Sequence, residues 1–252
     1  MNKIIKIIKS IAKFFGIKII KDRPSNSSEK QLSTILNLLN IDVVFDVGAN
    51  EGQFAREIRK HGYNGKIISF EPLTSARKNL LAFAECDSSW QVHEQSAIGD
   101  HDGKIDIHIA GNSVSSSILT MMESHSRAAV GSAYVGSERV TLFRLDSITN
   151  RYLERNSNLF IKIDTQGYEW QVLDGARDSL KSARGVLCEL SLVPLYHGQR
   201  LWRDIIDRLD QHGFMLWALQ KQFTDLSTGQ SLQMDGIFVR KTELKKIYKL
   251  YS

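Results

Sequence analysis

The sequence predicts an α/β fold in which helices cover both faces of a sheet that is rich in parallel strands. Apolar strand segments alternate with helical segments from residue 31 to residue 240. The first strand stops at an acid, Asp46, and runs through a turn bracketed by Gly48 and Gly52 into a helix. Two later strands also end at acids, Glu71 and Asp164. Because the carboxyl ends of parallel strands form the ligand-binding edge of such sheets, we expect these acids to face one crevice.

The expected elements follow from the periodicity of apolar residues and from the turn residues between them. A buried strand with the pattern LFIKI leads to Asp164, and the segment 96–98 either continues the preceding strand or starts a loop. The stretch 111–137 is rich in Ser, Gly and Ala and predicts a long loop, of the kind that often covers a substrate. We expect helices at 31–40, 52–61, 73–84, 168–182 and 201–212, and strands at 42–47, 66–70, 90–94, 104–109, 140–144, 159–163, 186–192, 214–219 and 236–240.

The bulk composition fits a folded protein of a reducing compartment. The chain has 252 residues, of which 42% are apolar, and this is enough to bury a sizeable core. Its two cysteines, Cys86 and Cys188, lie far apart and match no metal or redox spacing. We therefore expect no structural disulfide.

The positive charge is confined to the two ends of the chain. Residues 1–21 carry six lysines and no acid, whereas residues 241–252 carry four lysines and one glutamate. Since the net charge is +5, the stretch 22–240 carries −4, which argues against a groove for nucleic acid. The expected organisation is a basic helix over 1–21, a polar linker over 22–30, a folded domain over 31–240 and a basic tail over 241–252.

Residues 1–21 predict an amphipathic helix, in which the lysines at 3, 6, 9 and 13 share one side and isoleucines crowd the rest. Lysines interrupt every apolar run, so the segment is not a membrane span, and it lacks the cleavage site of a secretory signal. We interpret it as a helix that lies in the interface of an anionic membrane. The alternative is a helix packed on the body or on a partner subunit.

The turn after the first strand predicts a nucleotide-type cofactor site. Gly48 and Gly52 permit positive φ and a close approach of the backbone, and the following helix presents its N-terminus to a ligand. The spacing is G-x-x-x-G, because Asn50 stands where dinucleotide binders have their middle glycine. This spacing disfavours a nicotinamide-dependent oxidoreductase. Asp46 can accept hydrogen bonds from turn amides or face a cationic cofactor.

The acids that end the two later strands complete the predicted site. Glu71 is placed to accept hydrogen bonds from both ribose hydroxyls of an adenosine, and a surface acid that caps the next helix is its alternative. Asp164 can hold the cofactor, orient an acceptor or take its proton. Lys162 lies on the same face as Asp164, where it can pair with that acid or with substrate.

Seven segments together resemble the FkbM family of S-adenosylmethionine-dependent methyltransferases. They cover roughly residues 41–240 in family order: FDVGANEGQF, FEP, SAIGD, LDSI, KIDTQGYEWQVLDGA, ELSLVPLY and DGIFV. The resemblance implies a Rossmann-like class I methyltransferase fold, with seven strands of which the last is antiparallel. It also implies S-adenosyl-L-methionine as cofactor and methylation of oxygen, often on a sugar hydroxyl.

Carried over by motif, the resemblance assigns roles to individual residues. Asp46, Gly48, Asn50 and Gly52 would surround the methionine part of the cofactor, and Glu71 would hold its ribose. Ser96 and Ala97 would lie beside the adenine, and Asp164 would lie at the reaction centre.

Two residues depart from the family pattern: Gln166 and His197 each stand where relatives more often have an acid. A histidine titrates near neutral pH, so His197 is our second candidate for the catalytic base after Asp164, with a solvated loop residue as its alternative. We expect no metal site, because the histidines show no ligand spacing.

The sequence thus predicts an O-methyltransferase that acts on a glycan or glycolipid at the cytoplasmic face of a membrane, where the basic helix concentrates it near a lipid-linked acceptor. Methylation of a small secondary metabolite, a nicotinamide-dependent oxidoreductase and a non-catalytic membrane adaptor are the alternatives. Acids at the ends of all three strands disfavour an inactive adaptor.

Overall fold

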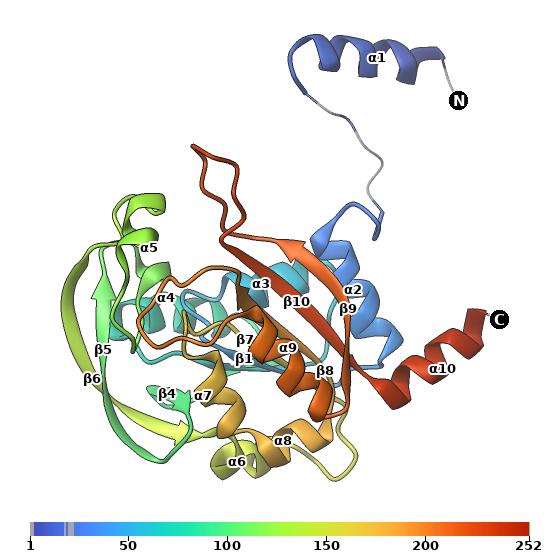
Figure 1. Ribbon diagram of the computed structural model, residues 1–252. Helices are drawn as coiled ribbons and strands as arrows, with labels where there is room; N and C mark the ends of the chain where they lie inside the picture. The colour runs from blue at the N-terminus through green and yellow to red at the C-terminus, as the bar shows by residue number, and fades with distance from the viewer. Residues whose placement is uncertain (1–2, 18, 20–22, 252) are drawn as a thin grey trace.

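The computed structural model describes residues 3–17, 19 and 23–251. Figure 1 shows α1 (Lys3–Phe14) set apart from an α/β body, which begins with α2 (Ser28–Leu38) and ends with α10 (Lys241–Tyr251). Residues 1, 2, 18, 20 and 21 of the expected N-terminal helix lie outside the described residues, as do residue 22 of the expected linker and residue 252 of the expected tail. In the described part of the chain, no helix has the length and apolar character that crossing a membrane requires.

A seven-stranded sheet forms the centre of the body and confirms the predicted fold class. Its strand order is β3-β2-β1-β7-β8-β10-β9; β10 runs antiparallel to both neighbours, and all other pairs are parallel. The strands are β1 (Val43–Val47), β2 (Lys66–Phe70), β3 (Trp90–Val92), β7 (Leu159–Ile163), β8 (Ala183–Ser191), β9 (Phe214–Lys221) and β10 (Gln233–Arg240).

Helices cover both faces of the sheet, because successive strand residues point to opposite faces and are apolar on both. Val44 and Phe160 point into the core beneath α2, α3 (Gln53–Lys60), α4 (Thr74–Ala84) and α10. Phe45 and Ile161 point into the opposite core. That core is closed by α6 (Leu145–Ile148), α7 (Glu169–Asp174), α8 (Arg177–Ser182) and α9 (Trp202–Gln211).

A second sheet of three strands, in the order β4-β6-β5, differs from the sequence expectation. It contains β4 (Ser96–Gly99), β5 (Gly103–Ala110) and β6 (Tyr134–Arg144). β6 begins six residues before the expected strand, within the stretch expected to be a loop. Most of its early residues are exposed, so no apolar alternation marked them as a strand. The shortened loop holds η1 (Ser113–Ser115) and α5 (Glu123–Ala128).

Three expected boundaries also shift. α2 starts at Ser28, where the side chain of Ser27 accepts a hydrogen bond from the Lys30 amide. The expected basic tail is instead helix α10, whose Leu244 and Ile247 are buried in the core. The single helix expected over 168–182 is two helices, because it breaks at Gly175, whose Cα lies against the backbone of Gly99.

The site is set by the central strands. The strand order reverses between β1 and β7, which is the switch point where sheets of this type bind ligands. Their register pairs Asp46 with Lys162, so both side chains lie on one face near the carboxyl edge.

Candidate active site

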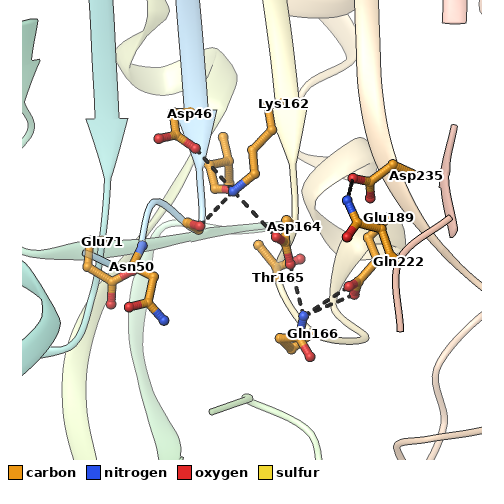
Figure 2. Close-up of polar contacts among 12 residues, drawn as sticks. Asp46, Asn50, Glu71, Lys162, Asp164, Thr165, Gln166, Glu189, Gln222 and Asp235 are labelled. Carbon is orange, nitrogen blue, oxygen red and sulfur yellow. Dashed lines mark hydrogen bonds and ion pairs between the residues drawn. The ribbon is translucent and has the colours of Figure 1, made fainter. Parts of the chain in front are cut away.

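A cavity of about 510 Å³ opens at the carboxyl edge of the sheet, within the size range of small-molecule sites. Asp164 and Lys162 line it and lie between Glu71 and Asp235, as Figure 2 shows. The part beyond β1 and β2, which we name the Glu71 lobe, is lined by residues 70–73, 96–98, 113, 114 and 116–118. The part toward β8, β9 and β10, which we name the Asp235 lobe, is lined by Leu32, Phe54, Leu187, Gln220, Gln222 and Asp235, among others.

The glycine turn after β1 brings bare backbone to the cavity. Gly48 has φ 75°, and a Cβ there would lie 1.8 Å from the carbonyl oxygen of Asp164. Gly52, with φ 82°, starts α3, and a Cβ there would meet the Trp90 ring at 2.8 Å. Asn50 also has a positive φ, of 47°, which asparagine tolerates. Both glycines are therefore required by close packing as well as by conformation.

Glu71 fixes this turn. Its Oε2 accepts the amide of Asn50 at 2.7 Å, and its Oε1 accepts the amide of Leu73 at 2.9 Å. Burial raises the pKa of Glu71 to about 7, against the opposing effect of these two amides. Each carboxylate oxygen keeps a further lone pair that can accept a hydroxyl from the cavity.

Asp46 and Lys162 form a buried ion pair under the middle of the cavity (Figure 2). Lys162 Nζ lies 3.1 Å from Asp46 Oδ1 and donates to the carbonyl oxygen of Gly48 at 2.7 Å. Asp46 is 0% exposed, and its Oδ2 accepts the hydroxyl of Ser69 at 3.3 Å. Burial opposes the charge of Lys162, but the carboxylates of Asp46 and Asp164 outweigh it and raise the pKa of Lys162. The lysine thus ties the glycine turn to β7.

Asp164 directly follows β7 and reaches the cavity. Its side chain is 38% exposed, and its Oδ2 lies 3.6 Å from Lys162 Nζ. Its Oδ1 accepts a hydrogen bond from Gln166 Nε2 at 2.9 Å. A carboxylate that is partly open to a cavity and oriented by two neighbours can bind a ligand or accept a proton.

Residues that the sequence reasoning missed hold the other side of the site. Glu189 on β8 accepts Gln166 Nε2 at 3.0 and 3.2 Å, and Asp235 on β10 accepts Gln222 Nε2 (Figure 2). Burial raises the pKa of Asp235 to about 6 and that of Glu189 well above its ordinary value, and the charge of Asp164 adds to both shifts. Acids inside the apolar segments VLCELS and MDGIFV were the only sequence signal for this cluster.

The predicted site residues divide into two groups. Gly48, Asn50, Glu71, Ser96, Ala97 and Asp164 line the cavity. Asp46 and Gly52 lie behind the lining: Asp46 reaches the cavity through Lys162, and Gly52 packs on Trp90. His197 is exposed outside the lining. Among residues 3–17, 19 and 23–251, no group of three or more His, Cys, Asp or Glu side chains is arranged to hold a metal ion.

The Glu71 lobe fits an adenosine-bearing cofactor. The Glu71 carboxylate offers acceptors for ribose hydroxyls, and the apolar side chains of Leu73, Ile98 and Ile107 offer a surface for a flat base. The glycine turn leaves room that a side chain at Gly48 would fill.

Comparison with known proteins agrees with this geometry. The family model of the methyltransferase FkbM domain matches residues 46–216. The 2-O-methyltransferase NoeI of Sinorhizobium fredii (strain NBRC 101917 / NGR234) is 27% identical over 200 residues, which are 74% of this chain and 79% of that protein.

Two solved structures are similar to this chain at low sequence identity. An S-adenosylmethionine-dependent methyltransferase from Mesorhizobium loti is 9% identical with a TM-score of 0.47, covering 86% of this chain and 100% of that one. An rRNA methylase from Streptococcus thermophilus is 8% identical with a TM-score of 0.44, covering 88% of this chain and 99% of that one.

The match to the family model spans the glycine turn, Glu71 and Asp164, and it excludes the nicotinamide-dependent alternative. The chain belongs to the FkbM methyltransferase family and is an S-adenosylmethionine-dependent methyltransferase.

Proposed function

We propose that this enzyme methylates a sugar hydroxyl of a glycan or glycolipid that is held at the surface of an anionic membrane. One observation carries the proposal: a single cavity joins the Glu71 lobe to the Asp235 lobe, and the partly exposed carboxylate of Asp164 lies between them. The similarity to a protein named as a 2-O-methyltransferase supports an oxygen acceptor.

In this proposal the Glu71 lobe holds the cofactor. Glu71 accepts the ribose hydroxyls, Ser96 and Ala97 lie beside the adenine, and the backbone from Gly48 to Asn50 surrounds the methionine part. Asp46 does not contact the cofactor in this proposal. It pairs with Lys162, and Lys162 holds the glycine turn by its hydrogen bond to the carbonyl oxygen of Gly48. Bound S-adenosylmethionine supplies a methyl group that is already activated on a sulfonium.

The Asp235 lobe suits an uncharged polyhydroxyl acceptor. The side chains of Gln220, Gln222 and Asp235 offer hydrogen-bonding groups, and the Phe54 ring offers a face on which a sugar ring can pack. Among the described lining residues there is no arginine, and Lys162 is the one lysine, which is already bound to Asp46. Phosphate and carboxylate groups, which arginine and lysine bind best, therefore lack partners here.

Asp164 is the proposed base. A hydroxyl that attacks a methyl group must lose its proton, and a carboxylate within hydrogen-bond reach can accept it. Oδ2 is the oxygen for this step, because Oδ1 is occupied by Gln166. Holding the hydroxyl in line with the methyl group is the main contribution of the protein. His197 remains the second candidate, on a loop outside the cavity lining.

The membrane part of the proposal is carried by α1. Its apolar side chains are exposed, including Ile7, Ile11 and Phe14, which is 87% exposed. Lys6, Lys9 and Lys13 lie on the other side of the helix, and this pattern suits the interface of an anionic bilayer. The linker after α1 leads to Ser28 and Glu29, which line the Asp235 lobe, so a lipid-linked acceptor would enter near the anchor.

A panel of matched acceptors tests the chemistry. The full-length enzyme is incubated with labelled S-adenosylmethionine and neutral p-nitrophenyl glycosides, and the product is located by NMR. We expect an O-methyl sugar and a decrease in kcat of about 100-fold to 10,000-fold for Asp164→Asn. Transfer to a small phenolic or polyketide hydroxyl in the same assay, with no transfer to any glycoside, would contradict the glycan proposal. It would identify a small secondary metabolite as the acceptor class.

Sedimentation with vesicles tests the location. Vesicles of phosphatidylglycerol should pull down the wild type, and the triple variant Ile7→Ser, Ile11→Ser, Phe14→Ser should stay in solution. Lys245→Ser with Lys246→Ser is the matched control, because it removes basic charge from α10 without touching α1. Equal sedimentation of the wild type and the triple variant would refute the role of α1.

A further inference from the structure

Gln166 has an environment that a solvent-exposed turn residue does not need. It stands in the left-handed region with φ 53°, although it is neither glycine nor asparagine. Its carbonyl oxygen accepts the hydroxyl of Ser117 at 2.6 Å, which ties the loop that contains η1 to the end of β7. The side chain enters the cavity between Asp164 and Glu189, as Figure 2 shows.

Every polar atom of the Gln166 carboxamide has a partner. Nε2 donates to Asp164 Oδ1 at 2.9 Å and to the two oxygens of Glu189 at 3.0 and 3.2 Å. Oε1 accepts the hydroxyl of Tyr196 at 3.0 Å. In this orientation the amide hydrogens face carboxylate oxygens, and the amide oxygen faces a hydroxyl donor.

The anchors of this amide are themselves rigid. Tyr196 is 1% exposed, and its hydroxyl also lies 3.3 Å from the carbonyl oxygen of Ser115. Its ring packs against Gly167, where a Cβ would approach it to 3.0 Å. Glu189 is buried within β8. Gln166 is thus held by two side chains that cannot swing away.

We infer that Gln166, anchored by Glu189 and Tyr196, is the positioning residue of Asp164: it occupies Oδ1, turns Oδ2 toward the acceptor hydroxyl and keeps the carboxylate charged. The inference rests on the proposed role of Asp164 as base. A neutral donor at this place stabilises the carboxylate form, whereas an acid would oppose it.

The surroundings of Asp164 are rich in acids. Of the residues that the structure describes, Lys162 is the cation paired with it, and that lysine is shared with Asp46. The neighbouring carboxyls repel a charge on Asp164 when they are ionised, whereas the phenol of Tyr196 and the thiol of Cys188, whose pKa values are raised by burial, stay neutral. The groups that face Asp164 are Asp46 from β1, Lys162 from β7, Glu169 from α7, Cys188 and Glu189 from β8, Asp235 from β10, and Tyr196 from the following loop.

Titration of Asp164 itself gives the direct test. The full-length protein is labelled with carbon-13 at the aspartate carboxyl carbons, and the Asp164 signal is assigned by its loss in Asp164→Asn. Gln166→Glu should raise the pKa of Asp164 by about one unit or more, because a like charge replaces a donor. Gln222→Glu is the matched control, since Gln222 donates to Asp235 and not to Asp164.

The control should move the pKa of Asp164 by less than a third of the Gln166→Glu shift. An unchanged pKa in Gln166→Glu, or equal shifts in both variants, would overturn the inference. This titration needs no acceptor, so it gives its answer even if no glycoside is methylated, an outcome that would defeat the proposed function instead.

A second pair of variants separates positioning from folding. Glu189→Gln keeps an acceptor for Gln166 Nε2 and should retain kcat within about threefold, whereas Glu189→Leu removes it and should lower kcat about tenfold or more. The KM for S-adenosylmethionine should stay unchanged in both. Equal kcat values, or a loss of cofactor affinity in both variants, would contradict the positioning role.

Discussion

The two lobes of the cavity hold their carboxylates in different ways. In the Glu71 lobe the acid is fixed by backbone amides of Asn50 and Leu73. In the Asp235 lobe, Asp235 is fixed by the side-chain amide of Gln222, and Glu189 behind the lining is fixed by that of Gln166. Backbone amides are present whatever the side chains are, whereas side-chain amides can be exchanged one at a time. If the lobes have the roles we propose, the cofactor site is built into the backbone of the fold, whereas the acceptor site can change by single substitutions.

The largest loss of cofactor affinity is expected from a substitution in the glycine turn. Gly48→Ala places a methyl group 1.8 Å from the carbonyl oxygen of Asp164, so the turn must move away from β7. We expect binding of S-adenosylhomocysteine, measured by calorimetry, to weaken about a hundredfold or more.

Gly62→Ala is the control for this change. It has a similar positive φ, of 89°, but a Cβ there meets nothing within 4 Å. It should cost only about 1 kcal/mol of folding free energy through backbone strain and should leave binding intact. Equal affinities of the two variants would show that the close approach of Gly48 to β7 is unimportant.

The next effect concerns protonation in the Glu71 lobe. Burial raises the pKa of Glu71 to about 7, and ribose hydroxyls would bind its charged form. As the pH increases toward this pKa, the affinity for S-adenosylhomocysteine should rise about tenfold per pH unit, and above the pKa it should level off. Glu71→Gln should weaken binding at high pH and remove this dependence. A wild-type affinity that does not change between about pH 5.5 and about pH 8 would exclude Glu71 as a ligand.

The stability of the cofactor-free protein should change with pH in the opposite direction, falling as the pH rises. The folded pKa of Glu71 lies above its ordinary value of 4.5, so folding takes up a proton. Its stabilising contribution is complete below about pH 4.5 and is lost as the pH rises through about 7. Glu71→Gln should therefore reduce the decrease of Tm over this window, as measured by calorimetry. An identical pH profile of Tm in the variant would contradict the raised pKa.

The smallest effect concerns charge in the Asp235 lobe. A neutral glycoside should be methylated with a kcat/KM about tenfold above that of the matching uronide, because the described lining residues offer no free cation for the carboxylate of the uronide. Asp235→Asn should narrow this ratio about threefold. Glu57→Gln, which removes a charge from the cavity lining at a side chain that is 43% exposed, should leave the ratio unchanged. Preference for the uronide would show that a cation outside the described residues serves the acceptor.

The Glu71 lobe could be predicted from sequence because its parts are contiguous. The strand, the acid and the glycine turn occupy residues 43–52, and the next strand ends at Glu71. Such short-range order is visible in one sequence. The fold class followed in the same way, from the alternation of strands and helices.

The Asp235 lobe could not be predicted, because it is assembled from distant segments. Glu189 and Asp235 meet only through the antiparallel pairing of β8 with β10, which a single sequence does not reveal. Within apolar strands, these acids gave no sign that Asp235 lines a cavity or that Glu189 binds the amide of Gln166 behind it. Ser28 and Glu29 were placed in a linker because the capped start of α2 lies among polar residues. Gln166 stood out only through the family resemblance.

The central claim is that Asp164 serves the acceptor while Glu71 serves the cofactor. Calorimetric titration of S-adenosylhomocysteine into Asp164→Asn and Glu71→Gln, near pH 8, tests it most directly. We expect Asp164→Asn to bind within about threefold of the wild type and Glu71→Gln to bind about tenfold more weakly or worse. Loss of binding in Asp164→Asn, with binding retained in Glu71→Gln, would contradict it.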